Sequence, residues 1–264
     1  NEKLFLRIKH VWEKRHELDT EQQILMDKIY DGFLRTGANL PKDKKEELAQ
    51  LRTQLSQLSL QFSQNELHDT NAWTMHLTDE GDLLGLPESA IVAARQEAEN
   101  RGLEGWIITL QAPSYGPFMQ YSQRRDLREK VYRAMNSICT HDNENNNFEN
   151  VRSIVNLRQQ LAQVMGYKNY ADFVLERRMA QDTEHVTDLM EKLLKSYRPV
   201  ALKEVEEIEQ LAKEKEGEDF TLQPWDFSHY GYLLKMQRYN IDSEMLRPYL
   251  QLEKVQEGVF GLAT

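Results

Sequence analysis

The sequence has 264 residues, of which 40% are hydrophobic, so it can build one large domain or two modest ones. Its formal net charge of -10 repels phosphate backbones, and no apolar run reaches the ~20 residues of a membrane span, so we expect neither general nucleic-acid binding nor membrane insertion. The single cysteine, Cys139, excludes an internal disulfide and is compatible with a reducing compartment.

Three helices are predicted in the first quarter of the chain. Apolar spacing predicts one helix over Glu2–His16 and a second that begins at a cap on Asp19 or Thr20 and closes at Gly37. Pro41 opens a third, longer helix. Its apolar residues alternate three and four apart, as Leu48, Leu51, Leu55, Leu58 and Phe62. We expect this seam to be largely buried against other helices of the same chain; a dimer interface is the alternative.

The pattern then changes to that of β-strands. Asp69–Leu77 and Trp106–Gln111 are rich in β-branched and aromatic residues, which predicts two strands that pair as a small antiparallel sheet. A helix over Pro87–Arg101 separates them. Ala112–Pro117 has the composition of a turn and is the nearest feature to a boundary. We therefore divide the sequence into residues 1–114, helical with the small sheet, and residues 115–264, helical throughout.

From Ser122 onward the pattern is helical, except for a polar loop over Thr140–Asn147. Glycine and capping residues place helices over Phe148–Met165, within Tyr167–Ala180, and from Asp182 to Gly217 with a kink predicted at Pro199.

The most aromatic stretch is Leu222–Leu250, which reads as two helices joined by a short turn. Pro224 suits a first helical position, Asp242 or Ser243 can cap the second helix, and Pro248 ends it. Its aromatic residues are predicted to be core: Trp225, Phe227, Tyr230, Tyr232, Tyr239 and Tyr249.

Seven blocks carry a family resemblance. In chain order they are NEKLFLRIKHVWEKRHEL, RTGANL, RDLREKVYRAM, MGYKNYADF, RMAQDTEHV, LQPWDF and EGVFGLA. Together they resemble the thimet oligopeptidase/neurolysin family of zinc metallopeptidases, and within it the bacterial peptidyl-dipeptidases (dipeptidyl carboxypeptidases). The resemblance implies a mainly α, neurolysin-like helical fold. It also implies a cytoplasmic enzyme that uses zinc as its cofactor and removes dipeptides from the C-terminus of short, unstructured peptides.

The zinc motif of that family, HExxH, is missing from the sequence. His16 and Glu17 start it, but Thr20 stands where the second histidine belongs. Both chain ends also lie inside helical patterns. We therefore expect an internal fragment, truncated before the zinc site, that supplies scaffold and channel wall and is inactive alone. No catalytic, cofactor-binding or metal-binding residue is assigned, and no zinc is expected in the fragment.

Other clusters have simpler interpretations than a site. His141, Asp142 and Glu144 could ligate a metal, but an Asn-rich loop favours a solvated turn. Cys139 near His141 has the residue types of a nucleophile and base, although a lone cysteine at a helix end is usually packed.

Two further alternatives concern a group of arginines and the function of the chain. Arg124, Arg125 and Arg128 could bind a carboxylate of a ligand, but salt bridges with neighbouring acids are the simpler interpretation. The competing function for the chain is a non-enzymatic helical interaction or scaffold protein that binds through the Leu48–Phe62 seam.

Overall fold

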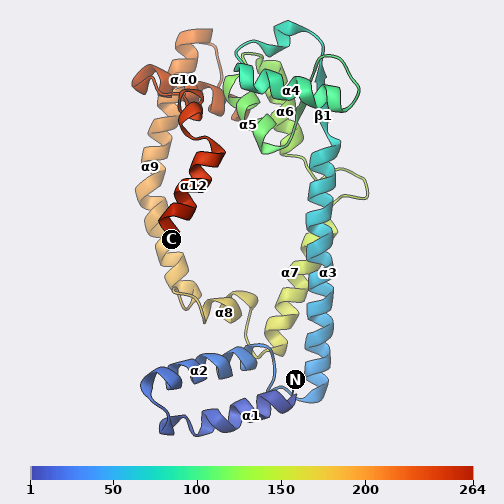
Figure 1. Ribbon diagram of the computed structural model, residues 1–264, viewed down its shortest axis with the longest axis vertical. Helices are drawn as coiled ribbons and strands as arrows, with labels where there is room; N and C mark the ends of the chain where they lie inside the picture. Colours follow the sequence, from blue (N-terminus) through green and yellow to red (C-terminus); the bar gives the residue numbers. More distant parts are fainter. Residues whose placement is uncertain (1, 264) are drawn as a thin grey trace. The chain divides into compact units, whose positions relative to one another are not determined.

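The computed structural model describes residues 2–263 and is mainly α-helical, with one two-stranded antiparallel sheet (Figure 1). The chain forms two compact units, each made of two segments. Unit 1 comprises Asn1–Asn65 and Asn146–Lys192, and unit 2 comprises Glu66–Asn145 and Leu193–Thr264. Among the described residues, no helix combines the length and the apolar character needed to cross a bilayer. The division at residues 114 and 115 stays a prediction.

Unit 1 begins with a helical pair, α1 (Glu2–Glu13) and α2 (Thr20–Arg35), joined through a short 3-10 helix, η1 (Arg15–Glu17). Asp19 caps α2 as predicted. Its carboxylate accepts the backbone N–H of Gln22 at 2.9 Å, and the Gln22 side chain accepts the Asp19 N–H at 3.4 Å. This reciprocal capping box satisfies backbone donors at the start of the helix. The buried Phe5 of α1 stacks on Tyr30 and Phe33 of α2, which holds the pair together.

The core of unit 1 lies between three further helices: α3 (Lys42–Ala72), α7 (Phe148–Val164) and α8 (Tyr170–Leu175). Leu48 and Leu51 of α3 are buried against Leu161 of α7 and Phe173 of α8. The seam therefore packs inside one chain, as predicted. Figure 1 shows α7 running alongside α3.

Leu55, Leu58 and Phe62 are less buried than Leu48 and Leu51, and Leu55 packs against the same core. Hydrogen-bonded asparagines meet the helix at the end of the seam. The Asn65 side chain donates to the Asn147 carbonyl oxygen at 2.9 Å, and the Asn147 amide donates to the Phe62 carbonyl at 3.1 Å. Because these groups must stay hydrogen-bonded, they replace part of the apolar contact.

The sheet in unit 2 pairs β1 (Thr74–Leu77) with β2 (Trp106–Thr109) in antiparallel register, with Met75 opposite Ile108, as the sequence predicted. The predicted first strand, Asp69–Leu77, begins too early, because α3 continues to Ala72. Its residues 69–72 lack apolar β-branched side chains, and extending an existing helix costs little compared with nucleating one.

Three helices adjoin the sheet: α4 (Glu88–Asn100) between the strands, and α5 (Ala112–Tyr121) and α6 (Arg125–Met135) after them. The prediction of a turn over Ala112–Pro117 is wrong, because this segment starts α5. Pro113 stands in the first turn, where its missing N–H has no partner to lose, and Pro117 removes only one hydrogen bond of the helix. The hairpin and these helices share one apolar core: Met75, Leu77, Leu83, Leu86, Ala94, Trp106, Ile108, Leu110, Phe118, Met119, Tyr121 and Val131.

The later elements are α9 (Thr183–Glu216), α10 (Phe227–Tyr239), α11 (Ser243–Leu246) and α12 (Leu252–Ala263), with short 3-10 helices η2 (Glu80–Leu83), η3 (Pro224–Asp226) and η4 (Arg247–Tyr249). Asp242 caps α11 as predicted, accepting the Glu244 N–H at 3.2 Å. The prediction of an aromatic core is correct for Tyr230, which is buried, but wrong for Phe227, Tyr239 and Tyr249, which are exposed. Helix α10 packs on α5 and η3, and Arg238 near its end forms an ion pair with Glu207 of α9.

A buried ion-pair group, here called the Asp226 cluster, joins α6 to η3 and consists of Asp226, Arg125 and Arg128. The Asp226 and Arg128 side chains are 0% and 1% exposed, and Arg128 Nη2 lies 3.0 Å from Asp226 Oδ1. Arg125 Nη2 lies 2.8 Å from Asp226 Oδ2. The carboxylate also accepts the Gln223 N–H at 3.0 Å, and Arg128 Nη1 donates to the Ser122 carbonyl at 2.6 Å. Both buried charges are thus paired and hydrogen-bonded, as burial requires.

Arg124 forms its ion pairs elsewhere, with Asp82 and with Asp126, whose Oδ2 is 2.8 Å from Arg124 Nη2. The sequence-based prediction that all three arginines form salt bridges with acids is therefore confirmed.

We expect Leu48→Ala to destabilise unit 1 by about 2–5 kcal/mol, because it leaves a cavity in a fully packed site. Urea unfolding followed by circular dichroism measures the change. Leu60→Ala on the same helix is the matched control, since Leu60 is 60% exposed and its loss should change stability by less than about 0.5 kcal/mol. Equal effects of the two variants would show that the seam does not form a core.

Asp226→Asn should destabilise unit 2 by about 3–5 kcal/mol, because it leaves the Arg128 guanidinium buried without a counter-charge. Asp126→Asn is the control. It removes an exposed partner of Arg124 and should cost less than about 1 kcal/mol. If urea unfolding gives both variants the same midpoint, the buried ion pair does not hold η3 on α6.

Candidate functional site

Metal-binding residues do not gather anywhere in the described part of the chain. No group of three or more His, Cys, Asp or Glu side chains within residues 2–263 is placed to hold an ion. His141, Asp142 and Glu144 lie exposed in their loop, where His141 Nε2 is 3.3 Å from the Ser137 hydroxyl. A catalytic zinc needs three converging protein ligands, so the residues present do not fit the metal that the family resemblance implies.

Cys139 is buried at 7% exposure, in line with the packed interpretation. Its backbone adopts a positive φ of 57°, which is uncommon for a residue other than glycine. The Asp69 carboxylate accepts its N–H at 2.6 Å, and this hydrogen bond anchors the end of the polar loop to α3. The local role that these contacts support is structural.

One cavity of unit 2 adjoins the Asp226 cluster. It has a volume of about 510 Å³ and brings together the ends of α5, α9 and the middle of α10. Its lining consists of Gly85, Tyr121, Gln123, Arg128, Lys215, Glu216, His229, Tyr230, Tyr232 and Leu233. This arrangement combines one buried guanidinium with an imidazole and three phenols.

His229 is the buried titratable group of this cavity, at 8% exposure. Burial lowers the pKa of His229, and the neighbouring Arg128 guanidinium lowers it further. The ring is therefore neutral at pH 7. Because Nδ1 lies 3.1 Å from the Gln120 carbonyl, which can only accept, the proton belongs on Nδ1 and the lone pair on Nε2.

The tyrosines beside His229 stay protonated. Burial and the adjacent Glu216 carboxylate raise the pKa of Tyr230 to about 12, and its hydroxyl donates to Glu216 at 3.1 Å. Burial likewise raises the pKa of Tyr121, whose hydroxyl donates to Asp242 at 2.6 Å. The cavity therefore combines neutral hydrogen-bonding groups with the charged Arg128, Lys215 and Glu216, an arrangement suited to binding a polar ligand.

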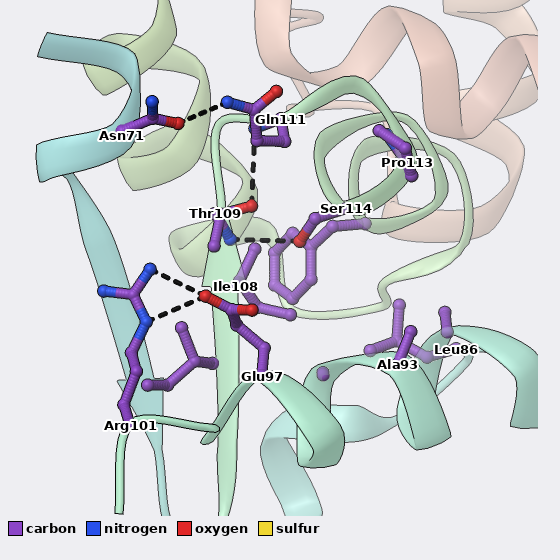
Figure 2. A pocket seen from close by; sticks show the side chains of 14 residues that line it. Asn71, Leu86, Ala93, Glu97, Arg101, Ile108, Thr109, Gln111, Pro113 and Ser114 are labelled. Carbon is purple, nitrogen blue, oxygen red and sulfur yellow. Dashed lines mark hydrogen bonds and ion pairs between the residues drawn. The ribbon is translucent and has the colours of Figure 1, made fainter. Parts of the chain in front are cut away.

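A second cavity of unit 2 has a volume of about 320 Å³ and lies between α4, β2 and the start of α5 (Figure 2). Ala90, Ala93 and Ala94 form its α4 wall, and β2 contributes residues 107–109. Polar side chains surround this apolar surface: Asn71, Glu97, Arg101, Gln111 and Ser114. Small side chains on a helix that faces a strand leave this space unfilled.

The sequence analysis missed both cavities. No role was predicted there for His229, and Asp226 appeared only within the block LQPWDF. The cavity beside the Asp226 cluster had one signal in the sequence. Asp226 is an acid inside an aromatic and otherwise apolar block, and such an acid needs a partner when it is buried. The cavity between α4, β2 and α5 also had a signal. Ala90, Ala93 and Ala94 have i, i+3, i+4 spacing, which puts three small side chains on one side of a helix.

Comparisons with known proteins identify the relatives of this chain. Oligopeptidase A of Escherichia coli is 38% identical over 247 residues, covering 92% of this chain and 36% of the relative. Probable cytosolic oligopeptidase A of Arabidopsis thaliana is 35% identical and covers 93% of this chain and 36% of the relative. Dipeptidyl carboxypeptidase of Escherichia coli is 29% identical and covers 100% of this chain and 39% of the relative. The chain thus spans little more than a third of the length of these relatives.

The sequence profile of one family, peptidase family M3, matches residues 118–264, which is more than half of the chain. The matched range includes α6, η3 and α10, the elements that carry the Asp226 cluster and His229. The resemblance read from the seven motif blocks is confirmed, and the chain belongs to peptidase family M3.

Proposed function

We propose that this chain is part of a zinc-dependent peptidase that acts on short peptides in the cytoplasm, and that it contributes scaffold and channel wall. The observation that carries the proposal is the family match over residues 118–264, together with the peptidase names of the relatives. Because residues 2–263 contain no ligand set, the metal would be held by residues outside them. The cytoplasmic location draws support from the single cysteine and from the cytosolic relative in Arabidopsis.

Two specificities are compatible with this family. The release of C-terminal dipeptides is supported by the seven motif blocks and by the dipeptidyl carboxypeptidase match across the whole chain. An oligopeptidase activity that is not confined to dipeptide units is the second candidate, since oligopeptidase A shares 38% identity against 29% for the carboxypeptidase. Mass spectrometry of the products separates them, because successive losses of two residues are the signature of the first.

The exposed apolar surface of the long helices supports a scaffold role. On α9, Leu189, Met190, Leu194 and Tyr197 are all more than half exposed, and on α12 Leu262 is 92% exposed. Apolar residues in such numbers on one helix mark a surface that another part of a protein covers. The competing function, an interaction protein that binds through the Leu48–Phe62 seam, loses its binding face because α7 and α8 already occupy Leu48 and Leu51.

We expect the purified 264-residue chain to hold no stoichiometric zinc and to leave short peptides uncut, because no three ligands converge within its described residues. A longer polypeptide that continues through the HExxH helix should bind about one zinc, cleave a quenched fluorescent peptide and lose activity to a chelator. Metal analysis by mass spectrometry and the fluorescence assay measure both.

The matched control is the longer polypeptide with the HExxH glutamate replaced by glutamine, which should keep its zinc and lose turnover. Zinc binding with turnover in the 264-residue chain would contradict the proposal. So would a longer polypeptide that binds zinc and cuts no peptide.

A further inference from the structure

We propose that the cavity between α5, α9 and α10 binds a small zwitterion that carries an ammonium group and a carboxylate close together, as a free amino acid does. The ammonium group donates hydrogen bonds to His229 and Glu216, and the carboxylate pairs with Lys215. The inference concerns binding alone, so it goes beyond the proposed peptidase function and is testable on this chain by itself.

His229 presents an unused hydrogen-bond acceptor in this cavity. The residue is 8% exposed and belongs to the lining. Its Nδ1 donates to the Gln120 carbonyl at 3.1 Å, which leaves the lone pair on Nε2. Within residues 2–263, Nε2 has no hydrogen-bond partner of its own. Because buried polar atoms are normally hydrogen-bonded, this one indicates a ligand that donates an N–H or O–H.

The three phenols of the cavity can likewise only accept a further hydrogen bond, since a tyrosine hydroxyl has a single proton to donate. Tyr121 and Tyr232 donate theirs to the Asp242 carboxylate, at 2.6 and 3.1 Å. Tyr230 donates to Glu216 at 3.1 Å. The phenol oxygens and the Glu216 carboxylate therefore surround the cavity with acceptors. A protonated amine complements such a set, because it has three N–H donors and a positive charge.

The two cations of the lining differ in how far their charges are already paired. Arg128 lies 3.0 Å from Asp226 and donates to the carbonyls of Ser122 and Trp225, at 2.6 and 3.4 Å. Lys215, in contrast, forms no ion pair and no side-chain hydrogen bond with any described residue. The Lys215 ammonium is therefore left for a carboxylate of the ligand.

The positions of the two unpaired charges favour an amino acid over a longer molecule. Lys215 and Glu216 are consecutive and form the end of α9, where the last carbonyls of the helix also favour a cation. A ligand that meets both needs its ammonium group and carboxylate near each other, and an α-amino acid carries them on one carbon.

The rest of the cavity suits an apolar side chain of that amino acid. Leu233 and the three tyrosine rings provide the apolar surface. The volume of about 510 Å³ lies within the ~300–1,000 Å³ range of ligand pockets.

The test is a titration of the ¹⁵N-labelled 264-residue chain with L-leucine, followed by NMR at the ring nitrogens of His229. We expect a saturable shift of Nε2, because a hydrogen bond to its lone pair changes its shielding. Glu216→Gln should weaken binding about tenfold, since the ammonium group loses a charged partner. Glu214→Gln is the matched control. It removes the same charge from an exposed position of α9 outside this cavity and should bind leucine as the unchanged chain does.

The cationic half of the site has its own pair of variants. Lys215→Gln should weaken binding about tenfold, because the carboxylate loses its partner. Lys213→Gln removes a charge two residues earlier, outside the cavity lining, and should leave the affinity unchanged.

Variants of the probe test each charge of the ligand without altering the protein. Isoamylamine keeps the ammonium group and lacks the carboxylate, and 4-methylpentanoate keeps the carboxylate and lacks the ammonium group. Each should bind about tenfold more weakly than leucine. The dipeptide Leu-Gly should also bind more weakly, since its carboxylate lies one residue farther from the ammonium group.

Any of three results would overturn the proposal. The first is the absence of a saturable shift at His229 Nε2. The second is equal affinity of either charge variant and its control. The third is a probe with one charge, or Leu-Gly, that binds as tightly as leucine. None of these bears on zinc binding or turnover, so failure here leaves the proposed peptidase function standing.

Discussion

The structure of unit 2 depends on one buried carboxylate. Asp226 has no solvent exposure, and its charge is compatible with burial only because Arg128 and Arg125 from α6 meet it. The pairing fixes η3 on α6 and so sets where α10 begins. Through α10 it also positions His229 and Tyr230 beside the end of α9. A contact between residues about a hundred positions apart thus decides the geometry of a whole cavity.

The apolar cores of the two units are bordered by different polar contacts. In unit 1 the leucine seam of α3 stops at hydrogen-bonded asparagines, with Asn65 donating to Asn147. In unit 2 the apolar core of the hairpin includes residues of α5 and α6. The ion pairs of Arg124, Arg125 and Arg128 lie at its border. Both solutions satisfy the polar groups that an apolar core would otherwise bury without partners.

Membership of peptidase family M3 and the absence of a ligand set within residues 2–263 fit together if the chemistry lies elsewhere in a longer polypeptide. The described residues are equipped for binding. The cavity beside Asp226 holds a neutral imidazole and protonated phenols, and the cavity beside β2 is lined by three alanines of α4.

The family, the mainly α-helical class, the antiparallel pairing of the two strands and several helix ends were all predictable from the sequence. These features depend on local signals: motif order, apolar spacing, and caps such as Asp19 and Asp242. The turn predicted over Ala112–Pro117 is instead the start of α5. Proline and glycine are typical of turns, but they also suit the first turns of a helix held by packing. Only the tertiary structure decided that Asp226 is the partner of Arg125 and Arg128. The same holds for the hydrogen bond from Asn147 to the Phe62 carbonyl and for the alanines of α4 that line the cavity beside β2. These are contacts between distant segments, and a one-dimensional pattern carries the propensity of each segment but not the identity of its neighbour.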